Sequence, residues 1–543
     1  HQAFETGAFA PAEAAYGQVL ALTPPDVSGR ATLVERQAAA IYRQAEAARA
    51  GGDTRAAVGH FARIGSLGAL PAQSALRATA QYDTAALLLG LKDWDTAAKA
   101  LEDFRRQFAG HALQAEVAPK LALAYMELGR HAQAAAEFDK VAATAQDPAV
   151  ARAALWQVAE LHQQAAAHAK PKSPLLATAI HTWQRYLQAH PQPLEPAVVA
   201  RWQLATLTQQ DGQAARATAW TRAVQLADQQ AGAARTPRTR TLGGQATLRL
   251  AEPLLAAYEK VPLIEPLQKQ LKLKKARMEE VLAAYATAAE VGVAEVTTAA
   301  TFHTAALYQD FGRALLQSQR PRKLNKAETE QYNVMLEEQA FPFEEKAIEL
   351  FETNARRTTS GLYDTWVQRS LAALAKLKPV RYAKVERMDA SGQPAPLDVA
   401  SLQARIDQNL ADGRQPQRLN QLGLAHRQQG HFALARAAYE AAIELAPQAV
   451  EPHFNLAILW DLYLGDAAKA QVLYQRCLAL SPQDAPLLGK WLAELKTRKP
   501  APGTPAPPAT ASAAPAPAPA GEPAGVSTGT PSAASTTPPK GKT

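Results

Sequence analysis

Apolar and small residues recur along most of this chain at the three- and four-residue spacing of amphipathic α-helices. A longer period is superimposed on that pattern near the C-terminal end, where a skeleton of six positions recurs after 35 residues, four of them with the same residue type. The first set is Gly430, Phe432, Ala435, Tyr439, Ala442 and Pro447, and the second is Gly465, Ala467, Ala470, Tyr474, Cys477 and Pro482. The same skeleton, from Gly7 to Pro24, opens the chain. A single helix pair cannot bury its apolar face, so this repeat predicts stacked pairs.

Each position of the repeat has a mechanical interpretation. Glycine turns one helix into the next, and a small residue such as Ala435 lets two helices approach closely. Tyr439 fills the gap between neighbouring units, and Pro447 ends the second helix because proline cannot continue it. The repeat-defining residues that we assign are Gly129, Ala134, Phe138, Gly423, Gly430, Ala435, Tyr439, Pro447, Gly465, Ala470, Tyr474 and Pro482. Partner-binding residues remain unknown from the sequence.

More degenerate units are expected in the N-terminal half, at a spacing that drifts between about 35 and 45 residues through insertions at the turns. The residues that mark them include Gly52, Ala57, Phe61, Trp94, Ala97, Leu101, Tyr125, Trp183, Tyr186, Leu204, Gly212 and Ala217. Residues 232–245 combine Gly, Pro, Thr and Arg and are predicted to be a loop, with Gly243 and Gly244 as a plain turn.

The predicted fold class is therefore all-α, a right-handed superhelical solenoid of antiparallel helix pairs. Its expected parts are a degenerate array at 1–231, a less regular region with longer helices at 246–378, a polar connector at 379–415, and a repeat pair with a capping helix at 416–498. Residues 499–543 are Pro, Ala, Ser and Thr with almost no large apolar side chain, so we expect a disordered tail.

Composition changes this picture little. Hydrophobic residues make up 47% of the chain and charged residues 20%, which is typical of a globular protein. No run of eighteen apolar residues exists, so no transmembrane segment is expected. The chain begins at His1, within what the pattern predicts to be the second helix of a repeat, so we expect a segment upstream, for which an export signal or lipid anchor is one candidate.

The repeat skeleton resembles that of tetratricopeptide-repeat proteins, whose period is 34 residues. The resemblance is carried by residues 416–482 and 115–148. It implies a helical solenoid whose concave groove holds an extended peptide or a partner helix. We expect carboxamide, arginine and alanine-backed positions to line that groove.

A second resemblance concerns residues 278–384. The segments EVTTAATF (295–302), EEQAFPFEEKAIELFE (337–352) and GLYDTWVQRSLAALAKLKPVRYAK (361–384) are similar to parts of large proteobacterial repeat proteins. That resemblance implies export to the periplasm, association with the outer membrane, and a link to proton-driven ExbB, ExbD and TonB-type components or to gliding motility.

Sequence motifs for catalysis are not found. The chain has no phosphate-binding loop, dinucleotide fingerprint or HExxH motif, and its twelve histidines are scattered. With one cysteine, Cys477, a thiolate zinc site is excluded, and that residue is predicted to be a small buried side chain. We therefore expect no catalytic, cofactor-binding or metal-binding residues, no cofactor and no enzymatic activity.

The net charge is +8, and basic residues gather at Arg235 to Arg240, at Lys269 to Arg277 and at Arg320 to Lys326. Aromatic residues are not interleaved with them, so nucleic acid is not the expected partner, whereas an anionic membrane surface or acidic protein remains open. We expect a periplasmic protein-interaction scaffold of an energy-transduction or motility complex. The alternatives are an adaptor for outer-membrane or pilus assembly, a cytoplasmic regulatory module, and an enzyme or nucleic-acid binder.

Overall fold

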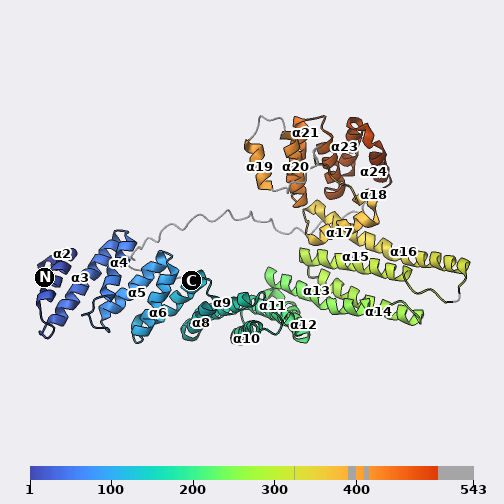
Figure 1. Cartoon of the computed structure of the whole chain (residues 1–543). Helices are drawn as coiled ribbons and strands as arrows, with labels where there is room; N and C mark the ends of the chain where they lie inside the picture. Colours follow the sequence, from blue (N-terminus) through green and yellow to red (C-terminus); the bar gives the residue numbers. More distant parts are fainter. Residues whose placement is uncertain (323, 389–398, 409–414, 499–543) are drawn as a thin grey trace, which may run out of the picture.

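Helices form almost the whole of the structure, a computed structural model that describes residues 1–322, 324–388, 399–408 and 415–498. Within those ranges there are 24 α-helices and no strand. Consecutive helices pack against one another as antiparallel pairs, which confirms the predicted all-α solenoid (Figure 1). The predicted disordered tail at 499–543 lies outside the described residues, as do parts of the predicted connector, at 389–398 and 409–414.

The N-terminal array is a row of helix pairs, drawn from blue to teal in Figure 1. Glycine or a capping side chain separates successive helices; for example, the Asp53 carboxylate accepts a hydrogen bond from the backbone N–H of Ala56 (2.9 Å). The helices are α1 (Gln2–Glu5), α2 (Phe9–Leu22), α3 (Arg30–Ala50), α4 (Thr54–Gly65), α5 (Ala75–Gly90), α6 (Trp94–Gln107), α7 (Val117–Glu127), α8 (His131–Thr144), α9 (Pro148–Ala166), α10 (Pro174–Ala189), α11 (Leu194–Gln210) and α12 (Ala214–Gln230).

The middle region contains longer helices. They are α13 (Pro237–Glu259), α14 (Leu267–Ala289), α15 (Ala294–Leu316) and α16 (Lys326–Arg356), followed by the shorter α17 (Thr365–Leu377) and α18 (Pro379–Tyr382). Two capping boxes start α13 and α16, at Thr236 and Asn325, and satisfy backbone N–H groups that a helix leaves free.

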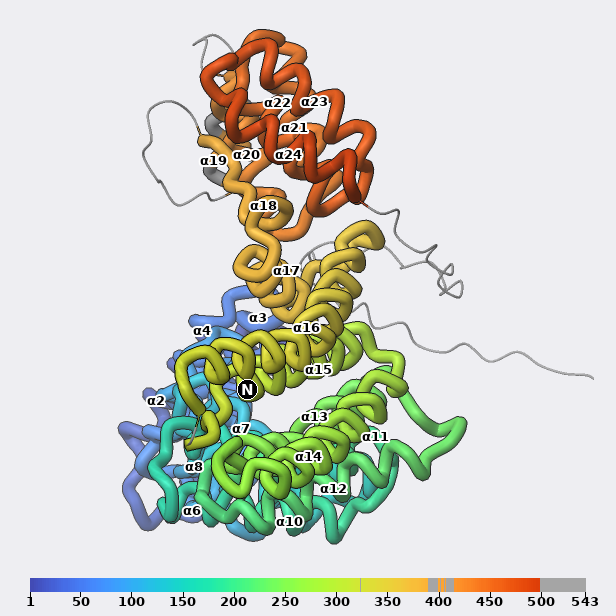
Figure 2. Tube along the Cα trace, turned by 90° about the vertical axis from the view of Figure 1, so that its right-hand side faces the viewer, coloured from blue at the N-terminus to red at the C-terminus, as the bar shows by residue number. Residues whose placement is uncertain are grey.

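The C-terminal unit comprises α19 (Val399–Gln408), α20 (Gln415–Gln428), α21 (Phe432–Leu445), α22 (Val450–Ile458), α23 (Ala467–Leu480) and α24 (Ala485–Thr497). A π-helical turn, η4 (Leu459–Tyr463), continues α22. Figures 1 and 2 show this unit, in orange and red, as a compact group that stands on α17 and α18.

The turns of the repeat share a left-handed glycine. Gly129, Gly430 and Gly465 have φ values of +69°, +81° and +74°, a left-handed conformation that side chains disfavour. After Gly430 the N–H of His431 donates to the carbonyl of His426 (2.8 Å), the long hydrogen bond of a Schellman turn. The equivalent bond after Gly129 runs from Arg130 to Tyr125 and is also 2.8 Å long.

The small and aromatic repeat positions form the core between helices. Ala134, Ala435 and Ala470 are fully buried, as are the side chains of Tyr439 and Tyr474. Phe138 is half-buried, and Pro447 and Pro482 follow the ends of α21 and α23. Cys477 is buried in this core as expected, and burial raises the pKa of its thiol to about 12.

The predicted loop at 232–245 is wrong for most of its length, because α13 begins at Pro237. Gly243 and Gly244 lie inside that helix rather than in a turn. A Cβ atom on Gly243 would lie 2.6 Å from an Asp228 carboxylate oxygen, and one on Gly244 would lie 2.8 Å from a Val296 methyl carbon. Close helix packing, not chain reversal, therefore explains both glycines.

Gly423 occupies a similarly tight contact in α20. A Cβ there would lie 2.5 Å from Cδ1 of the buried Tyr439 ring. We expect Gly423→Ala to destabilise the C-terminal unit by about 1–3 kcal/mol through overpacking. Gly489→Ala is the matched control, because Gly489 lies in α24 with no atom near its Cβ position, and it should stabilise by up to about 1 kcal/mol. Native-state hydrogen exchange of α21 and α24 amides would measure both, and equal effects would contradict the contact.

Candidate functional site: a groove that holds an extended segment

Residues 383–388 form an extended stretch, called the embedded segment here, that packs against the C-terminal unit. We call the surface that it contacts the C-terminal groove. The embedded segment follows α18 and has no helical structure. Its side chains alternate at first as in a strand, with Ala383 and Val385 exposed and Lys384 buried between them. This stretch belongs to the predicted polar connector, but the structure buries it against the repeats instead of leaving it as a linker.

Two buried asparagines hold the backbone of the embedded segment. The Asn455 side chain accepts a hydrogen bond from the Arg387 N–H (2.7 Å) and donates one to the Arg387 carbonyl (2.7 Å). Asn420 donates to the same carbonyl (3.0 Å), and the two asparagine amides are joined by a 2.9 Å hydrogen bond. Contacts to backbone groups do not depend on side-chain identity, so the asparagine pair does not itself select the sequence that it holds.

Lys384 anchors the segment at a fully buried ion pair with Asp461. The ammonium lies near the rings of Tyr474 and Trp491, at 5.1 and 5.0 Å from their centroids. Asp461 also accepts hydrogen bonds from Arg498 (2.8 Å) and from the Tyr474 hydroxyl (3.1 Å). Burial lowers the pKa of Lys384, and the Asp461 carboxylate opposes that shift. Asp461 lies in the π-helical turn η4, a type of turn that is frequent at functional sites.

Glu386 makes the second charged contact of the segment. Its carboxylate accepts hydrogen bonds from Nε of Arg427 (2.9 Å) and from the Tyr439 hydroxyl (3.4 Å). Burial raises the pKa of Glu386, although the Arg427 guanidinium favours the charged form. Tyr439 and Tyr474, which the repeat pattern predicts to pack between helix pairs, therefore also donate hydrogen bonds to carboxylates around the embedded segment.

Arg387 makes the third charged contact, a two-pronged ion pair with Asp484 (2.7 and 2.8 Å). Its guanidinium also lies 4.0 Å from the centroid of the Phe454 ring. The hydrogen bonds from Arg387 and then from Ser481 lower the pKa of Asp484 from 3.8 to about 2. Lys384, Glu386 and Arg387 of the embedded segment thus each form an ion pair with a side chain of opposite charge.

The depressed pKa gives a pH-dependent prediction. We expect Asp484→Asn to destabilise the C-terminal unit at neutral pH, and the difference from wild type to disappear as the pH falls from 3.8 to about 2. The carboxylate stabilises the fold fully above its unfolded pKa, and this contribution is lost as the pH falls through the folded value. Unfolding curves of both proteins over this range would measure it, and a pH-independent difference would contradict the assignment.

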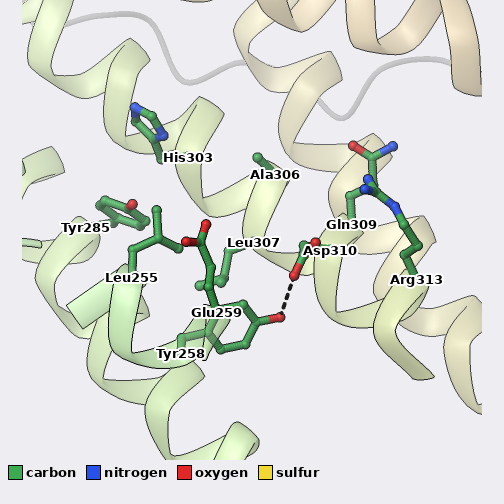
Figure 3. A pocket seen from close by; sticks show the side chains of 10 residues that line it. All are labelled: Leu255, Tyr258, Glu259, Tyr285, His303, Ala306, Leu307, Gln309, Asp310 and Arg313. Atoms are coloured by element: carbon green, nitrogen blue, oxygen red, sulfur yellow. Dashed lines mark hydrogen bonds between the residues drawn. The ribbon is translucent and has the colours of Figure 1, made fainter. Parts of the chain in front are cut away.

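A second hollow, with a volume of about 260 Å³, lies between α13, α14 and α15 (Figure 3). Inside it the Tyr258 hydroxyl donates a hydrogen bond to Asp310 (3.0 Å). His303 stacks on Tyr285 and contacts Trp366, with centroid distances of 5.5 and 4.7 Å. Burial lowers the pKa of His303, and among the described residues it has ring contacts but no hydrogen bond to a carboxylate. The aromatic contacts give this histidine a packing role.

Each of the three basic stretches contains a residue with a partner inside the fold; in the third stretch, Arg320 donates a hydrogen bond to Asn333 (2.8 Å). Arg235 forms an ion pair with the buried Asp228 (2.6 Å), and Lys274 is buried and donates to the carbonyls of Tyr258 (3.3 Å) and Val261 (3.1 Å). Several of the basic residues therefore stabilise the fold itself.

Among the described residues, no group of His, Cys, Asp and Glu side chains has the arrangement of a metal site. In the same part of the chain, no helix is both long enough and apolar enough to cross a membrane.

Comparison with known proteins identifies the repeat. Two tetratricopeptide-repeat family models match the chain, at residues 79–111 and 416–449, each of which covers one helix pair (α5–α6 and α20–α21). Together with the left-handed glycine turns, these matches show that the chain contains tetratricopeptide repeats, a type of repeat that supports a role in protein–protein interaction. Curated proteins give no match.

Two solved structures are similar at low sequence identity. A chain from the structure of Naa15/Naa10 bound to HypK-THB is 16% identical with a TM-score of 0.34, over 91% of this chain and 64% of that one. This chain thus spans less than two thirds of that protein's length. A chain of the APC/C hetero-tetramer Cut9-Hcn1 is 14% identical with a TM-score of 0.19, over 91% of this chain and 95% of that one.

Proposed function

We propose that this protein is a non-enzymatic scaffold that binds extended segments of partner proteins along the concave faces of its helical repeats. The observation that carries the proposal is the embedded segment. Asn420 and Asn455 bind its backbone, and the charged side chains around them select its charge pattern. A groove that seats six residues of its own chain in this way has the chemistry to seat a partner's segment.

The non-enzymatic part of the proposal is supported by the side chains of the middle hollow. Asp310 is engaged by Tyr258, and His303 is held among aromatic rings, so these two groups do not form a nucleophile and base pair. Cys477 is buried, and the raised pKa keeps its thiol protonated at neutral pH.

For the setting of the scaffold we propose the bacterial cell envelope, in a periplasmic complex for energy transduction or motility. This part rests on the resemblance of residues 278–384 to exported repeat proteins. Binding at a membrane surface is included in it, through the exposed lysines of α14. An adaptor for outer-membrane or pilus assembly and a cytoplasmic regulatory module are the alternatives.

Affinity purification from the native cells with mild crosslinking, followed by mass spectrometry, tests function and setting together. Recovery of ExbB-, ExbD- or TonB-type proteins, or of outer-membrane proteins, supports the envelope scaffold. Recovery of cytoplasmic proteins would leave the scaffold and overturn the envelope. Failure to recover any protein above a matched unrelated helical bait would count against the scaffold itself.

A further inference from the structure

While the embedded segment occupies the C-terminal groove, a partner needs another surface. One lies on α15 and α17 and is called the α15–α17 groove here. It encloses a volume of about 340 Å³. Its apolar lining includes Phe302 and Ala306 of α15 and Ala373 of α17. Small side chains at this position let a bound backbone approach the helices closely.

Three cations line the same groove: Arg313, Arg369 and Lys376. All three residues are exposed, and none of them forms an ion pair with any residue that the structure describes. Arg369 and Lys376 are seven residues apart on α17, so they lie on one face of that helix. Arg369 lies over the Trp366 ring, 4.8 Å from its centroid.

Carboxylates are absent from the lining of the α15–α17 groove. The closest contrast is the adjoining hollow of Figure 3, which shares Arg313 and is lined by Glu259 and Asp310. Asp310 accepts a hydrogen bond from Tyr258 there, and Glu259 is on the α13 side. Positive charge without an internal partner is thus concentrated along α15 and α17.

We propose that the α15–α17 groove binds an acidic, extended segment of a partner protein, with an apolar side chain placed over Phe302 and the alanines. The inference rests on the proposed function and names the partner's chemistry. The C-terminal groove shows the corresponding contact in this chain, where Glu386 is seated against Arg427. In the α15–α17 groove no described carboxylate forms an ion pair with the three cations, so the proposal assigns the acidic residues to the partner.

The test uses the full chain and a fluorescein-labelled peptide of about ten residues, roughly 33 Å when extended, made of Glu and Asp with a central Leu. Fluorescence anisotropy should show binding that weakens with added salt. A peptide with Lys in place of every acidic residue is the charge control. A single-stranded oligonucleotide of similar length distinguishes an acidic protein segment from nucleic acid.

The groove variant is Arg313→Glu with Arg369→Glu and Lys376→Glu. The matched control is Arg36→Glu with Arg49→Glu and Arg55→Glu, because these arginines are exposed on α3 and α4 and the change in net charge is the same. We expect the groove variant to weaken acidic-peptide binding at least about tenfold and the control to change it less than about twofold. The neutral triple Gln variant, checked by circular dichroism, separates lost charge from misfolding.

The inference is overturned if the wild-type chain does not bind the acidic peptide, if both triple variants weaken binding equally, or if the oligonucleotide binds more tightly through the same residues. Affinity purification of partners from cells distinguishes a failure of this inference from a failure of the proposed function. Partners that still bind the groove variant undiminished would sink the inference and leave the scaffold standing.

Discussion

Asp461→Asn should destabilise the C-terminal unit by about 3–5 kcal/mol, the largest effect that we expect from any single substitution in this protein. Asp461 is the counter-charge of Lys384, and both side chains are completely buried. Removing the carboxylate charge leaves the ammonium unpaired in a site that already disfavours its charged form. Native-state hydrogen exchange of α23 amides reports this local stability without assuming that the long repeat array unfolds in one step.

Two further variants make this prediction specific. Glu440→Gln removes one charge from an exposed i,i+4 pair with Arg436 and should change stability by less than about 1 kcal/mol. Adding Lys384→Met to Asp461→Asn should recover part of the loss, because the stranded charge is then gone. A cost below about 1 kcal/mol for Asp461→Asn, or a double variant worse than the single one, would contradict the account of this pair.

Asn455→Ala should release the embedded segment. It deletes two 2.7 Å hydrogen bonds to the backbone of Arg387 and leaves the N–H and carbonyl groups of that residue short of partners. The expected cost is about 1–3 kcal/mol, which corresponds to an opening equilibrium shifted roughly 5- to 150-fold. Limited trypsin digestion measures it directly, because trypsin cleaves after Lys384 and Arg387.

Asn354→Ala is the matched control for that experiment. Asn354 is a fully buried asparagine of α16 that donates to the Thr298 carbonyl (2.9 Å) and to the Ser370 hydroxyl (3.0 Å). Its loss should destabilise the middle region without accelerating cleavage at Lys384 or Arg387. Equal acceleration by the two variants would mean that the segment is held by general stability rather than by the asparagine pair.

Much of the fold follows from local sequence signals. The glycines at 129, 430 and 465 adopt the left-handed turns that their spacing predicts, and the alanines five residues later are fully buried. The clearer N-terminal unit was placed at 115–148, whereas the N-terminal family match falls on the preceding helix pair at 79–111. The error at 237–245 has a physical cause, because Gly and Thr in a tight helix contact give the same composition as a loop.

The groove was predictable only in part. Carboxamide lining was expected, and Asn420 and Asn455 are separated by the same 35 residues as the repeat glycines, so a signal for them was present. The sequence contains no comparable signal for the segment that the two asparagines hold. The segment 383–388 is only six residues long, with three charged and three apolar side chains and no helical periodicity. Its burial depends on Asp461, Asp484 and Arg427, which lie up to 97 positions further along the chain. Non-local charge pairing of this kind leaves no local pattern.

The measurement that tests the central claim most directly is amide hydrogen exchange at Arg387 in the free, full-length protein. We expect protection comparable to that of amides inside α21 and α23, because the Arg387 N–H donates to a completely buried Asn455. Exchange at the rate of an unstructured peptide would mean that the groove does not hold an extended segment. The scaffold proposal would then lose the observation that carries it.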